Sequence, residues 1–175
     1  MKKLLIPFFV LVISLNISSQ NGRNGPSLWE EIRVNSNLNY DNTKPQIIEA
    51  LKKYDSHQYL INRLSKNGQR YLFYTVSEAL KRDLPVELSL IPFIESQFDP
   101  YAQSSTGASG IWQFIPSTAI ENGLKKNWWY DARRDIVAST EAAYNFLVKL
   151  HQEHDDWLIA IAAYNAGPSR VRKEI

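Results

Sequence analysis

After the first twenty residues, apolar residues recur with helical spacing and alternate with polar ones over no more than a few positions. Between Gln69 and Lys81, apolar and small side chains follow one another at i, i+1, i+4 and i+5, which places them on one face of a helix. A half-buried strand needs strict alternation over about four to eight residues. The pattern therefore predicts an all-α fold.

Residues that start and stop helices divide this region into segments. Asp135 and Asp156 each stand before an apolar run, where a side-chain oxygen can accept a backbone N–H at the helix N-terminus. Gly167 followed by Pro168 predicts the end of the helix that Asp156 begins. A shorter helix is expected over residues 116–122, since a proline opens it and a glycine follows it.

Two further predictions concern the region before Glu95. Gly68 interrupts an apolar pattern, so we expect one helix to end before it and another to start after it. Asp83 can cap the next helix, and Pro92 inside that helix is expected to kink it just before Glu95.

The first twenty residues have the composition of a secretory signal peptide, a basic start followed by an apolar stretch over 4–17. This stretch is shorter than the roughly 20 residues of a spanning helix, although an uncleaved anchor remains the alternative. The chain contains no Cys, so neither a disulfide nor a lipid-modified cysteine is expected. We expect export to the periplasm or cell envelope and a fold that relies on its core.

The overall charge and the histidines limit the kinds of partner. The formal net charge of +2 includes Lys2 and Lys3, so the mature chain is close to neutral and lacks the basic character of a nucleic-acid-binding domain. His151 and His154 lie three positions apart at a helix end without a third ligand at a suitable spacing. No metal, cofactor or nucleic acid is expected, and a monomer is the expected state.

Glu95 is the first candidate for a catalytic group, because it follows an apolar stretch over residues 84–94. Desolvation of a carboxyl group raises its pKa and keeps its proton near neutral pH, which a general acid needs. A hydroxyl- and glycine-rich loop over 104–110 follows, and then Gln113 beside aromatic residues. These features suggest a carbohydrate site, with a partly buried structural carboxylate as the alternative.

Three ordered motifs carry a resemblance to a known family. Residues 94–102 read IESQFDPYA, residues 107–119 read GASGIWQFIPSTA, and residues 162–167 read AAYNAG. Together these segments resemble the catalytic core of lytic transglycosylases, the soluble-type transglycosylase domains related to goose-type lysozyme. The segment 127–140, NWWYDARRDIVAST, is similar more narrowly to the D-type, membrane-bound murein transglycosylases of this family.

The resemblance implies a fold and a role for each matching residue. It implies a lysozyme-like helical catalytic domain over residues 64–175, preceded by a linker and helical extension over 21–63. Family members usually continue with further helices, so a C-terminally truncated domain is expected. Glu95 matches the sole catalytic acid/base. The residues that match substrate contacts are Ser104, Thr106, Gln113, Tyr164 and Asn165.

The implied substrate is the peptidoglycan strand, cleaved between N-acetylmuramic acid and N-acetylglucosamine. Most glycosidases use two carboxylates about 5–9.5 Å apart, but neither Glu87 nor Asp99 is an obvious second partner for Glu95. The family mechanism has Glu95 protonate the glycosidic oxygen. Glu95 then takes the proton of the muramoyl C6 hydroxyl as this attacks C1, which gives a 1,6-anhydro sugar and consumes no water.

Other interpretations of the sequence stay open. A hydrolytic lysozyme-type muramidase would use water in place of the C6 hydroxyl, a peptidoglycan-binding module would not catalyse, and a purely structural helical domain would do neither. Trp128, Trp129 and Tyr130 could stack on sugars, but such a cluster more often packs an irregular segment onto the core, which is our expectation. Arg133 and Arg134 are interpreted as surface charge.

Overall fold

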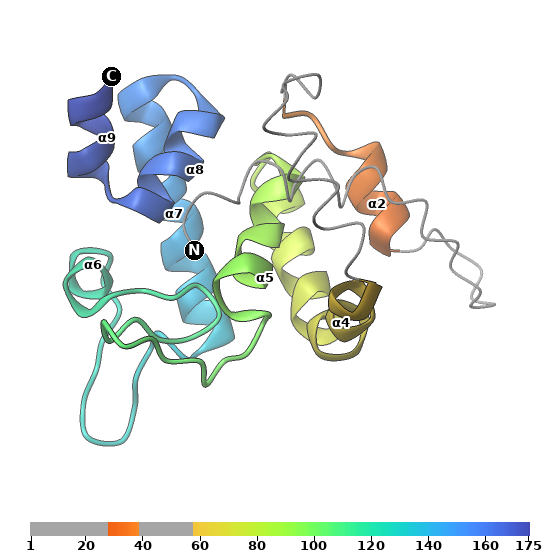
Figure 1. The fold of residues 1–175 in the computed structure, drawn as a ribbon, viewed down its shortest axis with the longest axis horizontal. Coiled ribbons are helices and arrows are strands. Elements are labelled where there is room, and N and C mark those ends of the chain that lie inside the picture. The colour runs from red at the N-terminus through yellow and green to blue at the C-terminus, as the bar shows by residue number, and fades with distance from the viewer. Residues whose placement is uncertain (1–27, 39–57) are drawn as a thin grey trace.

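The computed structural model describes residues 28–38 and 58–175, and within these ranges it contains helices and isolated β-bridges but no sheet (Figure 1). The predicted all-α fold is confirmed. None of the helices in this part of the chain has the length and apolar character needed to cross a bilayer. The predicted signal peptide over 1–20 and much of the predicted extension over 21–63 lie outside the described residues. The helices are α2 (Leu28–Val34), α4 (Gln58–Lys81), a 3-10 helix η1 (Val86–Leu90), α5 (Ile91–Ser96), α6 (Pro116–Glu121), α7 (Ile136–His154), α8 (Trp157–Ala166) and α9 (Pro168–Glu174).

Helix α4 is continuous, so the prediction of two helices separated at Gly68 is wrong. A glycine inside a helix costs about 1 kcal/mol relative to alanine, which tertiary packing can outweigh. Here the missing side chain makes room for a ring, since a Cβ on Gly68 would lie 3.3 Å from Cδ2 of Phe98. Phe98 is buried and follows α5, so Gly68 lets the chain after Glu95 pack onto α4.

The segment before Glu95 also differs from its prediction. It forms two short helices end to end, η1 and α5, rather than one helix kinked at Pro92. Pro92 lies in the first turn of α5, where its missing N–H has no helical acceptor to lose, so the proline opens a helix instead of bending one. Asp83 does not cap this segment: η1 follows Pro85, and no side-chain hydrogen bond caps it.

Helix α5 ends in a sharp turn. Gln97 and Phe98 both have a left-handed backbone, with φ of 55° and 59°, which residues with a Cβ seldom adopt. The Gln97 N–H donates to the Phe93 carbonyl over 2.9 Å, and the Phe98 N–H donates to the Pro92 carbonyl over 3.3 Å. Burial of the Phe98 ring offsets the strain, so packing fixes the turn that follows Glu95.

The C-terminal helices begin and end where the cap residues predict. The Asp135 side chain accepts the Ala138 N–H over 3.0 Å, and the Asp156 side chain accepts the Leu158 N–H over 2.6 Å. Gly167, with φ of 96°, closes α8. Helices α7 and α8 then pack side by side and α9 turns back beside α8, as Figure 1 shows at the blue end of the chain.

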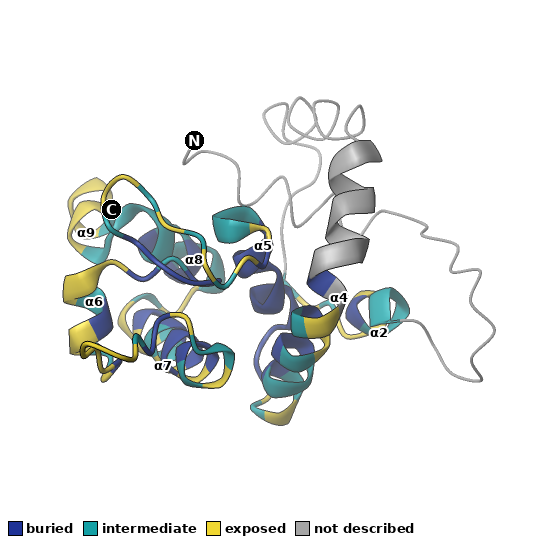
Figure 2. Cartoon of the chain, turned by 90° about the horizontal axis from the view of Figure 1, so that it is seen from below, coloured by how far each residue is buried: buried dark blue, intermediate teal, exposed yellow. Residues whose placement is uncertain are grey.

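The main core lies between α4, the η1–α5 segment and α7, with buried residues facing inward (Figure 2). Trp112 and Tyr144 are fully buried at its centre, with ring centroids 5.3 Å apart in an edge-to-face arrangement. The polar atom of each ring is paired, because Trp112 Nε1 donates to Thr140 Oγ1 over 3.0 Å and the Tyr144 hydroxyl donates to the Thr75 carbonyl over 2.6 Å. Helix α2 joins this core through the buried Ile32.

Candidate active site

Glu95 lies in the last turn of α5, directly after the buried Pro92 and Phe93 and partly exposed itself. The Nδ2 of Asn165, near the end of α8, donates a hydrogen bond of 3.1 Å to Glu95 Oε1. The structure thus joins the predicted acid to a predicted substrate-contact residue 70 positions later in the chain. An amide donor on one carboxyl oxygen fixes the orientation of the group.

Tyr164 precedes Asn165 and ties α8 to the second motif. Its hydroxyl donates to the Trp112 carbonyl over 2.9 Å, and its ring lies edge-on to Trp112 and Phe114, at centroid distances of 6.4 and 6.1 Å. Burial raises the pKa of the Tyr164 phenol well above its usual range, and the charge of Glu95 raises it further. The phenol therefore stays protonated and keeps donating to the loop, which positions Asn165 beside Glu95.

Gln113 serves the backbone of the same loop. Its φ is 50°, and its Nε2 donates to the Gly110 carbonyl over 2.8 Å and to the Ala102 carbonyl over 3.2 Å. An amide nitrogen has two N–H groups, so both are used within the loop. Gln113 therefore holds the second motif against the end of the first.

Ser104 and Thr106 form a hydrogen-bonded pair of their own in this loop. Their hydroxyl oxygens lie 2.9 Å apart, and Ser104 Oγ also accepts the Ala108 N–H over 3.0 Å. The backbone closes the same turn, because the Ser104 N–H donates to the Ala108 carbonyl over 2.9 Å. The two hydroxyls are thus fixed in place by the loop, and their predicted contact with substrate stays a prediction.

Sequence reasoning missed Arg133, which is only 5% exposed, so its interpretation as surface charge is wrong. The guanidinium donates to Asp131 Oδ2 over 2.6 Å, to the Gly107 carbonyl over 2.8 Å and to the Phe114 carbonyl over 3.2 Å. Arg133 therefore holds the start and the middle of the second motif. An aspartate two positions before the arginine was the available signal. Arg134 is exposed, as expected.

Two small residues complete the attachment of this loop. Ser96, next to Glu95, donates its hydroxyl to the Ile111 carbonyl over 2.9 Å and so joins α5 to the loop. Gly110 has φ of 81°, and a Cβ there would lie 1.8 Å from the Arg133 carbonyl oxygen. Only glycine permits this close approach of the two chains.

The prediction that Trp128, Trp129 and Tyr130 pack onto the core is wrong. Their exposed fractions are 87%, 90% and 43%. They lie at the tip of a hairpin in which Lys126 and Asp131 form an isolated β-bridge. Because the backbone groups of the hairpin hydrogen-bond to one another, the hairpin can stand away from the core and expose these rings.

The histidines at the end of α7 are part of local packing. The rings of His151 and Trp157 are stacked, with centroids 4.1 Å apart. Within residues 28–38 and 58–175, no group of three or more His, Cys, Asp or Glu side chains is arranged to hold a metal ion.

Sequence similarity defines the class of protein to which this fold and site belong. The profile of the family described as "Transglycosylase SLT domain" matches residues 75–175, more than half of the chain. The chain belongs to this family, as the three motifs predicted. The matched region contains Glu95, Gln113 and Asn165.

Individual relatives narrow the resemblance. The chain is 44% identical over 131 residues to membrane-bound lytic murein transglycosylase D of Escherichia coli (strain K12), an alignment that covers 74% of this chain and 29% of that protein. It is 46% identical over 112 residues to an Alteromonas sp. (strain M-1) protein named for tributyltin chloride resistance, covering 63% of this chain and 54% of that one. It is also 35% identical over 92 residues to membrane-bound lytic murein transglycosylase F of Desulfosudis oleivorans, covering 49% and 19%.

These alignments confirm the predicted similarity to the D-type transglycosylases. They also show that the chain spans less than a third of the length of the E. coli relative and about half that of the Alteromonas relative.

Proposed function

We propose that the chain is a peptidoglycan lytic transglycosylase that cleaves the β-1,4 bond between N-acetylmuramic acid and N-acetylglucosamine and leaves 1,6-anhydro-N-acetylmuramic acid. The observation that carries this proposal is the 3.1 Å hydrogen bond from Asn165 to Glu95, which holds one carboxyl group in a fixed orientation. Membership of the transglycosylase family and the names of the murein transglycosylase relatives support the substrate.

In the proposed reaction, Glu95 acts first as an acid and then as a base. In its acid form the Glu95 carboxyl group carries a proton while Oε1 accepts the Asn165 N–H. This proton goes to the glycosidic oxygen as the C1–O bond breaks. The muramoyl C6 hydroxyl then attacks C1 and gives its proton to the Glu95 carboxylate, which restores the acid. An intramolecular nucleophile of this kind has a high effective concentration and needs no bound water.

The surroundings of the two nearest acids in the sequence favour this single-carboxylate reaction over hydrolysis. Glu87 is fully buried, and its Oε1 accepts hydrogen bonds from Ser36 Oγ, over 2.6 Å, and from the backbone N–H groups of Asn37 and Leu38. Asp99 Oδ1 accepts the Tyr101 N–H over 2.9 Å and so closes a turn. Most hydrolytic glycosidases use a second carboxylate that faces the sugar, whereas Glu87 and Asp99 each use a carboxyl oxygen to hold backbone.

We also propose which residues form the catalytic unit and where in the cell it acts. Helix α4 runs unbroken from Gln58, so we include the whole helix with the predicted unit of residues 64–175. Residues 1–20 carry the composition of a signal peptide, and two relatives are named membrane-bound murein transglycosylases. Both points favour action in the cell envelope, where peptidoglycan lies.

Mass spectrometry of the fragments released from purified peptidoglycan tests the proposed function. We expect muropeptides that end in anhydro-muramic acid, each one water lighter than the corresponding hydrolysis product. Reducing-end muropeptides would replace the proposal with a lysozyme-type muramidase. Binding to sacculi without any released fragment would replace it with a non-catalytic peptidoglycan-binding module.

A further inference from the structure

Residues 125–134 form a hairpin, here named the aromatic hairpin, that the proposed reaction does not use. Its strands are joined by hydrogen bonds from the Ala132 N–H to the Lys125 carbonyl, over 2.9 Å, and from the Asn127 N–H to the Tyr130 carbonyl, over 2.8 Å. The Asn127 side chain accepts the backbone N–H groups of Trp129 and Tyr130, over 2.9 and 2.8 Å. The turn that carries the tryptophans is therefore preformed.

The base of the aromatic hairpin is fixed to the rest of the domain. Arg133 pairs with Asp131 within the hairpin and donates to the carbonyls of Gly107 and Phe114 in the second motif. The Tyr130 hydroxyl donates to Asp135 Oδ2 over 3.0 Å, at the start of α7. A rigid base with a preformed tip loses little conformational entropy when it binds a ligand.

The tip exposes an aromatic surface that the fold leaves uncovered. Trp128 and Trp129 are 87% and 90% exposed, and their ring centroids lie 6.3 Å apart with an interplanar angle of 87°. The two rings thus form a corner with open faces. Rings this exposed bury little apolar surface and so stabilise the fold little, and their exposure therefore points to a ligand.

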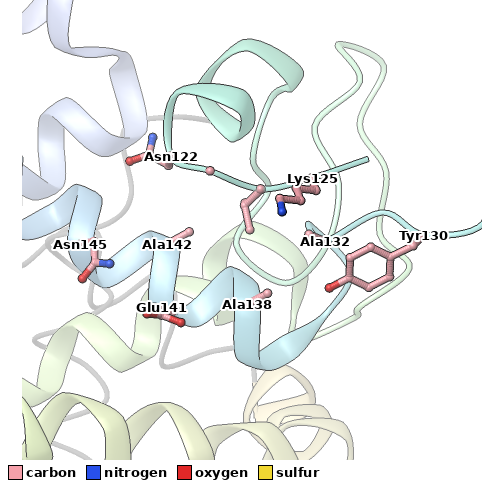
Figure 3. Close-up of a pocket in the computed structure, with 10 residues that line it drawn as sticks. Asn122, Lys125, Tyr130, Ala132, Ala138, Glu141, Ala142 and Asn145 are labelled. Carbon is pink, nitrogen blue, oxygen red and sulfur yellow. The ribbon is translucent and has the colours of Figure 1, made fainter. Parts of the chain in front are cut away.

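A hollow lined by both polar and apolar residues lies beside the base of the hairpin (Figure 3). Its volume is about 310 Å³, and it opens between the hairpin base and α7. Lys125 and Tyr130 contribute from the hairpin side, and Glu141 and Asn145 contribute from α7. An amine, a phenol, a carboxylate and an amide here offer both donors and acceptors at the base of the hairpin.

We propose that the aromatic hairpin is an accessory carbohydrate-binding site, which stacks a pyranose ring of the peptidoglycan strand on Trp128 or Trp129. The C–H face of a sugar suits an open indole face, and hydroxyl or acetamido groups of the same strand suit the polar groups that line part of the hollow. The exposed Lys125 adds a positive charge near a polymer that carries carboxylates. The inference rests on the proposed function, because it assumes the same polymer, but it concerns binding and not cleavage.

The same observations favour a sugar over a lipid bilayer. Tryptophan also suits membrane interfaces, but here only two side chains project, directly above the polar Asn127 and the Lys126–Asp131 pair, whose charged atoms are 3.9 Å apart. The neighbouring hollow is lined in part by ionisable and amide groups. A bilayer would have to desolvate these groups on contact, whereas a sugar can hydrogen-bond to them.

Binding of the mature chain to purified sacculi, measured by co-sedimentation in a Glu95→Gln background, tests the accessory site without cleavage. The test variant is Trp128→Ala/Trp129→Ala, and the matched control is Phe73→Ala, which removes an aromatic ring that is 62% exposed on α4. We expect the Kd for sacculi to rise about tenfold in the test variant and to stay unchanged in the control. Equal thermal unfolding temperatures verify that all three chains are folded.

Vesicles of phosphatidylethanolamine and phosphatidylglycerol provide the second probe. The accessory site predicts no vesicle binding that depends on the tryptophans. An unchanged Kd for sacculi in the double variant would overturn the proposal, and so would tryptophan-dependent vesicle binding with unchanged sacculus binding. Failure of the parent chain to bind sacculi would overturn it as well. The proposed function is judged separately, by the anhydro products of the unsubstituted chain.

Discussion

The hydrogen bonds that form the Glu95 site join residues far apart in the sequence, whereas those that form the tip of the aromatic hairpin join close neighbours. The bond from Asn165 to Glu95 joins residues 70 positions apart, and the bond from Tyr164 to the Trp112 carbonyl spans 52. The turn of the aromatic hairpin is instead closed by Asn127, which binds the backbone two and three residues later. The site exists only when the core is formed, whereas the hairpin tip is specified locally.

Because of this difference, we expect the two regions to contribute differently to stability and to function. Residues of the Glu95 site both complete the core and orient the Glu95 side chain, so changing them is expected to affect stability and the proposed activity together. The hairpin tip adds almost nothing to the core, so changing it affects binding alone. Four predictions, in decreasing order of their effect on the free energy of unfolding, test this separation.

The largest effect is expected for Gly110→Ala, where the added Cβ would lie 1.8 Å from a backbone oxygen. We expect a loss of more than about 3 kcal/mol in the free energy of unfolding, measured by urea denaturation. Gly123→Ala is the matched control, since its φ of 76° is also positive but nothing lies within 4 Å of its added Cβ. It should lose only about 1 kcal/mol through backbone strain. Equal losses would mean that close approach at Gly110 is unimportant.

A smaller effect is expected for Tyr164→Phe, which leaves the Trp112 carbonyl without its 2.9 Å donor. Removal of one partner of such a bond costs about 1–2 kcal/mol. Because α8 also carries Asn165, the rate at which fragments are released from peptidoglycan should fall together with stability. Tyr101→Phe, on a residue that is 74% exposed, is the control and should change neither quantity. A stable Tyr164→Phe chain with full activity would contradict the positioning role.

The two regions should respond to opposite ends of the pH scale. Hydrogen bonds from Arg133 lower the pKa of Asp131, so the stability from this pair is present above about pH 4 and is lost as the pH falls. Burial raises the pKa of Tyr164, so its contribution is present below about pH 10 and is lost as the pH rises beyond that. Denaturation curves across pH should therefore flatten on the acid side in Asp131→Asn and on the alkaline side in Tyr164→Phe. The reverse assignment would refute the account of these groups.

The smallest effect on stability is expected for Trp128→Ala/Trp129→Ala. Because the rings are 87% and 90% exposed, the free energy of unfolding should stay within about 0.5 kcal/mol of the original. Calorimetry of the double variant checks this value. A loss above 2 kcal/mol, on the order of a buried side chain, would show that the tip belongs to the core after all.

The features that the sequence predicted correctly depend on neighbouring residues. Asp135 and Asp156 cap their helices as expected, because a cap needs only the next few backbone N–H groups. The errors at Gly68 and Arg133 have a different origin. Gly68 stays within α4 because Phe98 packs over it, and Arg133 is buried because distant carbonyls accept its hydrogen bonds. Neither partner can be identified from local pattern.

The candidate site divides in the same way. The family motifs predicted Glu95 and Asn165 by position, but their hydrogen bond depends on the packing of α8 against the second motif. The motifs also predicted a substrate contact for Gln113, which stays a prediction, but not that its amide nitrogen donates to two loop carbonyls. These carbonyls belong to Ala102 and Gly110, and the turn that brings them to Gln113 is not visible in residue type alone.

The most direct test of the account is the rate at which Glu95→Gln releases anhydro-muropeptides from sacculi, at matched folding and matched sacculus binding. Glutamine keeps the shape of the side chain but cannot donate and accept the catalytic proton. The account predicts a rate at least about 10³-fold lower than that of the unsubstituted chain, with full activity in Glu121→Gln, a change at an exposed glutamate on α6. Release of the same anhydro products by Glu95→Gln at a rate within about tenfold of the original would contradict the assignment of Glu95 as the acid and base.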